Sequence, residues 1–405
     1  MTVSASGKLR VLILLNRIPF PLNDGGAIGA FSFVKGYAES GAEVTALAMN
    51  TAKHFVDRSL LKDSLLNYAT LHDVYIDNKI KPVDALINLF TGESYLIERF
   101  KSKVFDAKLQ ELLQQNNFDV VHIDGLPPAL YIPTIRRFSK AFVSMRAHNV
   151  EHVIWQRTAA NTVNIFKKWY LGLQAKRLSN FEFTALEQTD VTMAISREDE
   201  QTIKDFCPAA KTIIVPASMD IADECPKGNA EVNPLFLIGS FDWLPNEQGV
   251  EWFIAEVWTK LSSAFPDLKF VIAGKKMSEK MKSVKTEKLL PIGEVPDAKE
   301  FVLKGGIMIV PIISGSGIRI KILEGMALGK CIVATTIAAE GLGLTDGENI
   351  LIADSADEFI EKIGRCLSDA AYRERIAKNA HTFALENFQN KKVFDKLTAF
   401  YRQQI

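Results

Sequence analysis

The clearest pattern along the chain is a series of short, continuous apolar runs rich in Val and Ile. Such runs are typical of strands that are buried on both faces of a parallel sheet. They cover residues 10–16, 42–49, 119–124, 141–147, 191–196 and 212–217 in the first half, and 234–241, 268–274, 306–313, 330–335 and 348–353 in the second. Segments with helical spacing, such as 30–40 and 249–265, lie between them. The alternation predicts an α/β chain with right-handed crossovers.

The alternation restarts near residue 234, after the polar stretch DIADECPKGNAEVN, and a linker is expected from about Pro216. A chain of 405 residues is also too long for a single core to be the favoured arrangement. We therefore predict two Rossmann-like, doubly wound domains, 1–217 and 218–385, followed by helical residues 386–405. The carboxyl ends of the strands in both domains should face a common cleft.

Composition narrows the range of partners. Lysine plus arginine and aspartate plus glutamate number 48 each, so no net field favours nucleic acid, and we expect none as a partner. The four cysteines form no CxxC pair and are typical of free thiols in a reducing compartment. No window reaches the roughly 20 apolar residues of a membrane-spanning helix, and the first apolar run is too short for a signal peptide. These features predict a cytoplasmic protein.

The most informative stretch, residues 311–335, reads PIISGSGIRIKILEGMALGKCIVAT. It predicts the end of a buried strand, a turn at 314–317 and a helix over 318–329. A glycine-rich turn at a helix N-terminus gathers backbone N–H groups, and the helix dipole adds partial positive charge there. Arg319 and Lys321 add two full positive charges where they are locally unfavourable, so an anion is the expected partner.

Glu324 falls on the same predicted helix among apolar neighbours such as Ile320 and Leu323. An ionised carboxylate is unfavourable there unless a donor binds it. A ribose diol offers two donors; alternatively, Glu324 pairs with Lys321 three residues earlier at a partly exposed edge. Strand, turn, two cations and a carboxylate together favour a nucleoside-diphosphate site. We expect its lining to include Gly315, Ser316, Gly317, Ile318 and Glu324.

This stretch resembles the nucleotide-sugar motif of family-four glycosyltransferases. Glu324 matches the second of two glutamates eight positions apart, and EGMALGKCIVAT is similar to the family's EAMAxGxPVVAT. Ser316 stands where the first glutamate would fall, as it does in a subgroup of the family. The resemblance implies the GT-B fold of two facing Rossmann-like domains, retention of anomeric configuration and no metal. It also implies that the helix at 386–405 crosses back to the first domain.

Two further signals extend the expected site. Gly25 and Gly26 follow the first strand, and the resemblance implies that their loop lines the cleft; steric need at a strand-to-helix turn is the alternative. His148 follows the run 141–147, and it matches a family histidine that contacts donor phosphate or sugar. His122 and His152 are interpreted as structural. A metal cluster of His148, Glu151 and His152 would lack a fourth ligand, so no metal is expected.

The stretch LFLIGSFDWLPNEQG departs from the family pattern. Many relatives carry an arginine and a lysine here that hold the diphosphate, whereas this chain has Ser240 and Asn246. We expect Arg319 and Lys321 to supply the same two charges from the opposite loop, with Gly239 and Ser240 still close to the phosphates or the sugar. His148, Arg319 and Lys321 are the predicted catalytic residues.

The sequence thus predicts a glycosyltransferase that moves a sugar from a nucleoside-diphosphate donor to a glycan, lipid-linked or small-molecule acceptor. The first domain would hold the acceptor, the second the donor, and surface polysaccharide or glycoconjugate synthesis is the expected setting. A GT-B sugar-nucleotide epimerase and a noncatalytic nucleotide-sugar-binding protein are the alternatives. Basic and aromatic residues in 164–183 predict either a peripheral contact with the inner face of the membrane or a solvated helix face.

Overall fold

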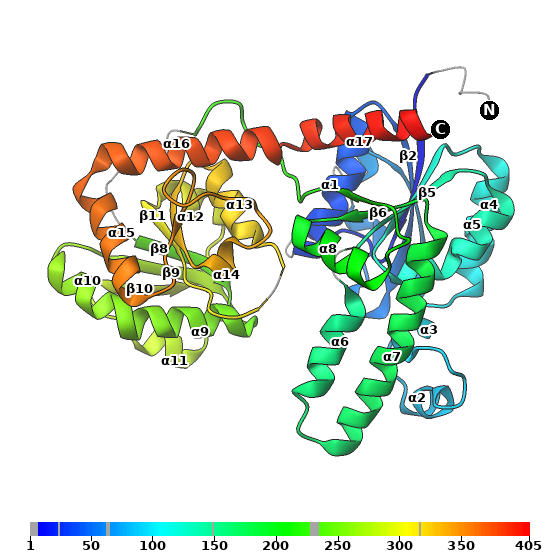
Figure 1. Ribbon diagram of the computed structural model, residues 1–405, viewed down its shortest axis with the longest axis horizontal. Coiled ribbons are helices and arrows are strands. Elements are labelled where there is room, and N and C mark those ends of the chain that lie inside the picture. The colour runs from blue at the N-terminus through cyan, green and yellow to red at the C-terminus, as the bar shows by residue number, and fades with distance from the viewer. Residues whose placement is uncertain (1–6, 23–24, 62–64, 148–149, 227–234, 316) are drawn as a thin grey trace. The chain divides into compact units, whose positions relative to one another are not determined.

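The structure, a computed structural model, describes residues 7–22, 25–61, 65–147, 150–226, 235–315 and 317–405. It divides into two compact units (Figure 1). The first unit comprises Met1–Ser218 and Asn390–Ile405, and the second comprises Met219–Gln389. The chain therefore enters the second unit after Ser218 and returns to the first at Asn390. The sequence analysis predicted these two boundaries after residues 217 and 385.

In its described residues, the first unit contains a seven-stranded parallel sheet in the order β3-β2-β1-β4-β5-β6-β7. The strands are β1 (Arg10–Leu15), β2 (Glu43–Thr51), β3 (Thr70–Ile76), β4 (Val120–Asp124), β5 (Phe142–Arg146), β6 (Val191–Ala194) and β7 (Thr212–Ile214). The strand order reverses between β1 and β4, which is the doubly wound topology expected from the sequence.

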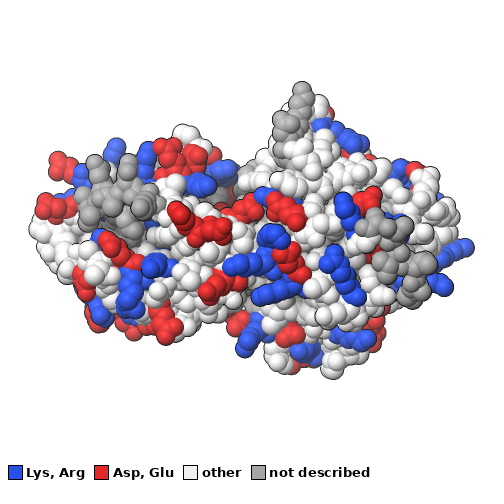
Figure 2. Space-filling view, turned by 90° about the horizontal axis from the view of Figure 1, so that it is seen from above, with Lys and Arg blue, Asp and Glu red and all other residues white. Residues whose placement is uncertain are grey.

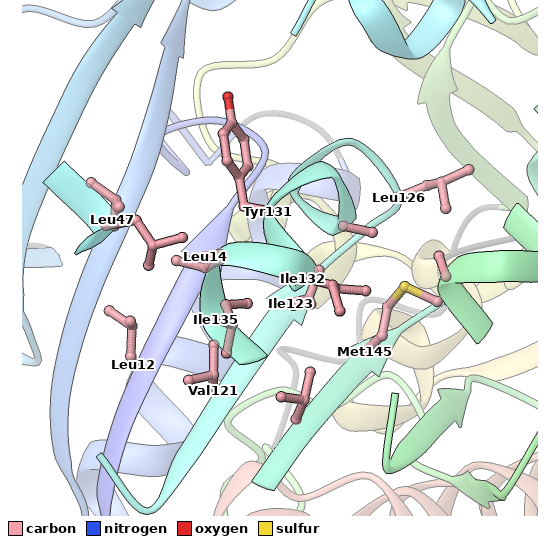
Figure 3. Packing of buried hydrophobic residues seen from close by; sticks show 14 of the residues in the cluster. Leu12, Leu14, Leu47, Val121, Ile123, Leu126, Tyr131, Ile132, Ile135 and Met145 are labelled. Atoms are coloured by element: carbon pink, nitrogen blue, oxygen red, sulfur yellow. The ribbon is translucent and has the colours of Figure 1, made fainter. Parts of the chain in front are cut away.

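Helices cover both faces of this sheet. They are α1 (Gly25–Glu39), α2 (Pro82–Asn88), α3 (Tyr95–Glu98), α4 (Lys103–Gln115), α5 (Ile132–Phe138), α6 (Glu151–Ala160), α7 (Ile165–Gln188), α8 (Arg197–Phe206) and α17 (Asn390–Gln404). Leu12 and Leu14 of β1 join a cluster that includes Ile135 of α5 (Figure 3). Ile13 and Leu15 point to the other cluster, with α1 and α17. Both faces are therefore buried, which explains the continuous apolar runs.

The C-terminal helix α17 is part of the first unit. Its Phe394 packs against α1 at Gly36, where a Cβ would overlap the phenylalanine ring, so a side chain at this position would exclude the helix. The Tyr401 hydroxyl donates to Ser144 Oγ of β5 at 2.7 Å and lies 3.1 Å from the Tyr37 hydroxyl. The expected return of the C-terminal helix to the first domain is confirmed.

The second unit repeats the same order with a six-stranded parallel sheet in its described residues, β10-β9-β8-β11-β12-β13. Its strands are β8 (Leu235–Ser240), β9 (Phe270–Lys275), β10 (Leu289–Gly293), β11 (Ile307–Val310), β12 (Cys331–Ala334) and β13 (Leu351–Ile352). Its helices are α9 (Leu244–Phe253), α10 (Thr259–Ala264), α11 (Glu279–Ser283), α12 (Ala298–Lys304), α13 (Ile320–Ala327), α14 (Thr336–Ala339), α15 (Ala356–Ser368) and α16 (Ala370–Asn387).

Several elements differ from the sequence prediction. The helix expected over 249–265 starts earlier, at Leu244, and a π-helical turn at Ile254–Trp258 joins α9 to α10. The helix expected over 318–329 is shorter, because α13 begins at Ile320 and ends at Ala327. Strands β3 and β10 were not predicted. Both lie at sheet edges, where strands tolerate the polar residues or the proline that obscure the apolar pattern.

Other sequence expectations concern the whole chain. No helix in the described ranges is long and apolar enough to cross a membrane. The four cysteines, Cys207, Cys225, Cys331 and Cys366, are free thiols as expected. Figure 2 shows Lys and Arg interspersed with Asp and Glu on the face that it presents. This mixture agrees with the equal numbers of acidic and basic residues in the sequence.

Candidate active site

The predicted donor residues of the second unit meet where the strand order of its sheet reverses. Strand β8, which ends at Ser240, pairs with β11, and the glycine-rich turn follows β11. Ligands of doubly wound sheets bind outside the carboxyl ends of the strands at such a reversal. Gly249 of α9 brings the two loops together, since a Cβ there would overlap the carbonyl oxygen of Pro311.

Lys321 reaches from α13 to the end of β8. Its Nζ donates to Asn246 Oδ1 at 2.7 Å, and Asn246 Nδ2 donates to the Ser240 carbonyl at 2.8 Å. A Cβ on Gly239 would lie only 2.9 Å from Lys321 Nζ, so glycine leaves room for the ammonium. Burial, followed by the nearby Arg319 guanidinium, lowers the pKa of Lys321 to about 7, against the opposing effect of Glu324.

Arg319 is the residue that immediately precedes α13, at its N-cap, and its side chain is buried. Its Nη1 donates to the Gly317 carbonyl at 2.7 Å, and its guanidinium lies over the Trp243 ring, with Cζ 4.7 Å from the centroid. Gly315 has φ of 105° and packs close to Trp243 and Arg319, which favours glycine there. Trp243 thus holds the guanidinium by a cation–π contact.

Glu324 lies one turn after Lys321 and is exposed, not enclosed by apolar neighbours as the sequence suggested. Burial by the protein around its carboxyl group nevertheless raises the pKa of Glu324, and Lys321 opposes this shift. The group therefore combines access from solvent with partial desolvation. Ile318 is half-buried, whereas Gly315 and Gly317 are exposed. Ser316, where the family motif has its first glutamate, lies outside the described residues.

The predicted site residues of the first unit are placed only in part. Gly25 and Gly26 are the first two residues of α1 and are exposed; the expected loop is therefore the helix start itself. His148 lies outside the described residues. His152 is buried, and its Nδ1 lies 2.7 Å from Glu182 Oε2, which agrees with its structural interpretation. Glu182 also accepts hydrogen bonds from the backbone N–H of Glu151 and of His152, at the start of α6.

His122 is likewise structural. It is fully buried in β4, its ring stacks on Phe33, and its Nδ1 lies 3.2 Å from the Tyr37 hydroxyl. The histidine therefore belongs to the buried polar network that also includes Tyr401. Among the described residues, no group of three or more His, Cys, Asp or Glu side chains could hold a metal ion.

The sequence analysis missed an ion pair beside the corresponding reversal in the first sheet. Asp124 ends β4 and Arg146 ends β5; the two residues are paired in register, and Arg146 Nε lies 2.9 Å from Asp124 Oδ1. Arg146 also donates to the carbonyl of Gly29 in α1 at 3.0 Å and lies over the Phe33 ring. Asp124 is the last residue of one predicted apolar run and Arg146 the last but one of another, and this position at strand ends is the signal that could have indicated them.

Comparison with known proteins adds a domain assignment. Residues 233–369 match the model of the family described as glycosyl transferases group 1. The match spans the second sheet together with the turn, the two cations and Glu324. Most of the second unit thus matches this family model. The glycosyltransferase expected from the sequence is confirmed at the level of this domain and of the fold.

Similar proteins support the same conclusion for the fold. A sucrose-phosphate synthase of Thermosynechococcus elongatus is 14% identical, with a TM-score of 0.66 over 98% of this chain and 99% of that one. The HepE protein of Anabaena, solved with UDP and glucose, is 13% identical, with a TM-score of 0.62 over 97% and 99%. A Klebsiella pneumoniae relative, an uncharacterized 44.6 kDa protein in cps region, is 24% identical over 96% of this chain and 98% of its own length. The GT-B fold is confirmed.

Proposed function

We propose that this protein is a family-four, retaining glycosyltransferase that transfers a sugar from a nucleoside-diphosphate donor to an acceptor hydroxyl without a metal. The donor would bind to the second unit, and the acceptor to the first. The reaction would take place in the cytoplasm and serve surface polysaccharide or glycoconjugate synthesis. The Klebsiella relative described as lying in cps region supports the last part.

One observation carries the proposal. The ammonium of Lys321 stands at the carboxyl end of β8, and its hydrogen-bond acceptor is the neutral amide of Asn246. The Arg319 guanidinium approaches from the same turn, and the N-terminus of α13 adds the positive end of its dipole. Burial lowers the pKa of Lys321 because it disfavours the charged form. A bound anion would favour the charged form again, so the ammonium and the anion would stabilise each other. A diphosphate supplies that anion.

These groups can also assist the reaction. When the glycosidic bond breaks, negative charge develops on the leaving diphosphate. Arg319, Lys321 and the N–H groups at the start of α13 are fixed in place before the reaction and stabilise that charge without reorganisation. The exposed Glu324 can accept two hydrogen bonds from a ribose diol. The leaving phosphate would itself help to deprotonate the acceptor.

The similar structures suggest which donor to test first. HepE was solved with UDP-glucose, and a trehalose-6-phosphate protein of E. coli was solved with UDP-2-fluoro glucose. A thermal-shift screen of UDP, GDP, ADP and their sugars would identify the base. The best donor would then be tested for hydrolysis or transfer, with EDTA to test metal independence and NMR of the product to establish the anomeric outcome.

Arg319→Ala combined with Lys321→Ala should weaken donor binding by about 100-fold or more, since two charge-assisted contacts are lost. Calorimetry measures the affinity, and circular dichroism checks that the fold is intact. Lys282→Ala with Lys285→Ala, which removes two exposed charges elsewhere in the same unit, is the matched control. Unchanged affinity in the site variant would refute the proposal.

A further inference from the structure

The first unit carries a helical hairpin that projects from its sheet. Helices α6 and α7 run side by side away from the strands (Figure 1) and are joined by residues 161–164. The hairpin is anchored at its base, because the Glu182 carboxylate of α7 accepts the first backbone N–H groups of α6. At the far end, Asn164 caps α7 by accepting from the Lys167 backbone N–H at 3.0 Å. These hydrogen bonds cap the first turn of each helix of the hairpin.

The end of this hairpin is unusually apolar for a surface. Val163 is 100% exposed, Phe166 81% and Trp169 62%. Ile165 is 73% exposed beside them. Single exposed apolar residues are ordinary on a protein surface, but a group that includes two large aromatic side chains indicates an interaction site.

Helix α2 lies beside α7 and carries exposed apolar side chains of its own. Asn88 at its end accepts from Gln174 Nε2 of α7 at 2.9 Å, and Arg177 of α7 donates to the carbonyls of Asn88 and Leu89 at 2.8 and 2.9 Å. These bonds hold α2 alongside α7. Exposed apolar side chains of this segment are Val83 (67%), Leu86 (61%), Ile87 (59%) and Phe90 (88%).

Over residues 152–181 the charged side chains of the hairpin have a single sign. Between Glu151 and Glu182 the sequence contains no Asp or Glu, whereas the whole chain has as many acidic as basic residues. The basic residues in this interval are Arg157, Lys167, Lys168, Lys176 and Arg177. Lys167 and Lys168 are exposed and lie directly beside Phe166 and Trp169. Apolar side chains flanked by cations match a lipid surface with anionic headgroups.

We propose that this apolar tip, formed by residues 163–169 and by Val83, Leu86, Ile87 and Phe90 of the α2 segment, docks the protein on a lipid bilayer that contains anionic headgroups. The aromatic and aliphatic side chains enter the boundary between headgroups and acyl chains, where Trp is favoured. The lysines beside them contact lipid phosphates. The proposal extends the peripheral contact suggested by the sequence, and it does not depend on which reaction the protein catalyses.

A second copy of the chain fits this surface less well. A symmetric dimer through the tip would bring two like sets of cations against each other, because the same patch faces itself across a two-fold axis. Like charges placed across an interface are unfavourable. An anionic lipid surface instead neutralises them, so the charge pattern selects the bilayer as the partner.

Vesicle co-sedimentation of the full chain tests the proposal. We expect binding to vesicles of phosphatidylcholine with phosphatidylglycerol, weak binding to phosphatidylcholine alone, and release by high salt. Lys167→Gln with Lys168→Gln should weaken binding about 25-fold, since each cation near an anionic surface contributes about fivefold. Lys392→Gln with Lys396→Gln, which removes two exposed lysines from α17, should leave it unchanged.

The apolar contribution has its own variant. Phe166→Ser with Trp169→Ser should weaken binding at least about tenfold, because two aromatic side chains no longer leave water. Val284→Ser with Ile292→Ser, which alters two exposed apolar positions of the second unit, serves as the control. Circular dichroism of each variant shows whether the fold persists, and both site variants lie on the surface.

The depth to which Trp169 enters the bilayer is tested by tryptophan fluorescence. Brominated acyl chains should quench the wild-type emission, and Trp169→Phe should lose most of that quenching while still binding vesicles. Equal binding to neutral and anionic vesicles, unaltered binding of both tip variants, or quenching that persists in Trp169→Phe would overturn the proposal. So would light scattering that shows a dimer which the tip variants convert to a monomer, because that result makes a second copy the partner.

Discussion

The two sheets have the same strand order, but a buried cation near the point where that order reverses has a different partner in each. In the first unit Arg146 lies 2.9 Å from the Asp124 carboxylate, and both side chains are almost fully buried. In the second unit Lys321 donates to the neutral Asn246 amide, and burial lowers its pKa to about 7. The first cation is neutralised within the chain, whereas the second has a neutral partner and would, under the proposed function, receive an anion from outside.

This difference separates a structural ion pair from a candidate binding site. Removing one partner of a buried ion pair leaves an uncompensated charge and strongly destabilises a fold. A lysine with a neutral partner contributes less to stability, and an arriving anion raises its pKa and so favours its charged form. Variants at the two reversals should therefore affect different properties, namely stability in the first unit and ligand affinity in the second.

The largest effect is expected from Arg146→Ala. It leaves the Asp124 carboxylate buried without its partner, which should destabilise the first unit by about 3–5 kcal/mol. Hydrogen exchange of peptides from β4 and β5, compared with peptides from β8 and β11, measures each unit in the intact chain. Arg146→Ala combined with Asp124→Asn should recover part of the loss. A change below about 1 kcal/mol would show that this pair is no more structural than Lys321.

Asn246→Asp would give the second unit the arrangement of the first. The new carboxylate neutralises Lys321, and the nucleoside-diphosphate donor should then bind at least about tenfold more weakly, or about 1.4 kcal/mol. Titration calorimetry measures the affinity. Asn246→Ala removes the same amide contacts without adding charge and separates the two causes. Donor affinity equal to that of the wild type would end the contrast between the units.

The pH dependence of stability should have opposite signs in the two units. Burial and then Glu182 raise the pKa of Glu151 from 4.5 to about 7, so the folded first unit holds the extra proton and loses stability as pH rises through this range. Burial and the nearby Arg319 lower the pKa of Lys321 from 10.5 to about 7. Between these values the unfolded chain binds the extra proton, so the second unit gains stability as pH rises from 7 towards 10.5.

Each contribution should be about 1 kcal/mol after screening by solvent. Glu151→Gln should flatten the dependence of the first unit's stability on pH below pH 7. Lys321→Met should flatten the dependence of the second unit's stability on pH above pH 7. Hydrogen exchange across a pH series measures both. Slopes of the same sign in the two units would contradict the assignment of either group.

The smallest expected effect is the uptake of a proton when the donor binds. At pH 8 the Lys321 side chain is mostly neutral, since its pKa is about 7, and a bound diphosphate should return it to the charged form. Binding of a nucleoside-diphosphate sugar should therefore take up close to one proton, which calorimetry in buffers of different ionisation enthalpy detects. Lys321→Met should bind with no proton uptake. Uptake that survives this substitution would point to another group.

The sequence predicted the parts of the fold that depend on local pattern. The apolar runs at 10–16 and 306–313 became β1 and β11 because strands buried on both faces need continuous apolar residues. Strand β3, with the sequence TLHDVYI, was not predicted because an edge strand tolerates polar side chains, which interrupt the apolar pattern. Gly25 and Gly26 were predicted as a loop, since glycine is a poor helix former, yet they open α1.

The candidate site was predictable only as far as its residues are neighbours in sequence. Arg319, Lys321 and Glu324 lie within six residues of the chain, so their proximity could be predicted. The contact of Lys321 with Asn246 joins residues far apart in sequence and depends on the packing of α9 against β11. The Asp124–Arg146 pair likewise requires the register of β4 and β5, which a single sequence does not reveal.

The course of the final helix matters for the gene as well as for the fold. Ser218 Oγ donates to Asn390 Oδ1 at 2.8 Å, so the two ends of the inserted second unit meet at one place within the first. A premature stop codon just after residue 389 would spare every residue of the second unit but remove Phe394 and Tyr401 from the core of the first. Loss of the residues after 389 would thus damage the unit that the ribosome makes first.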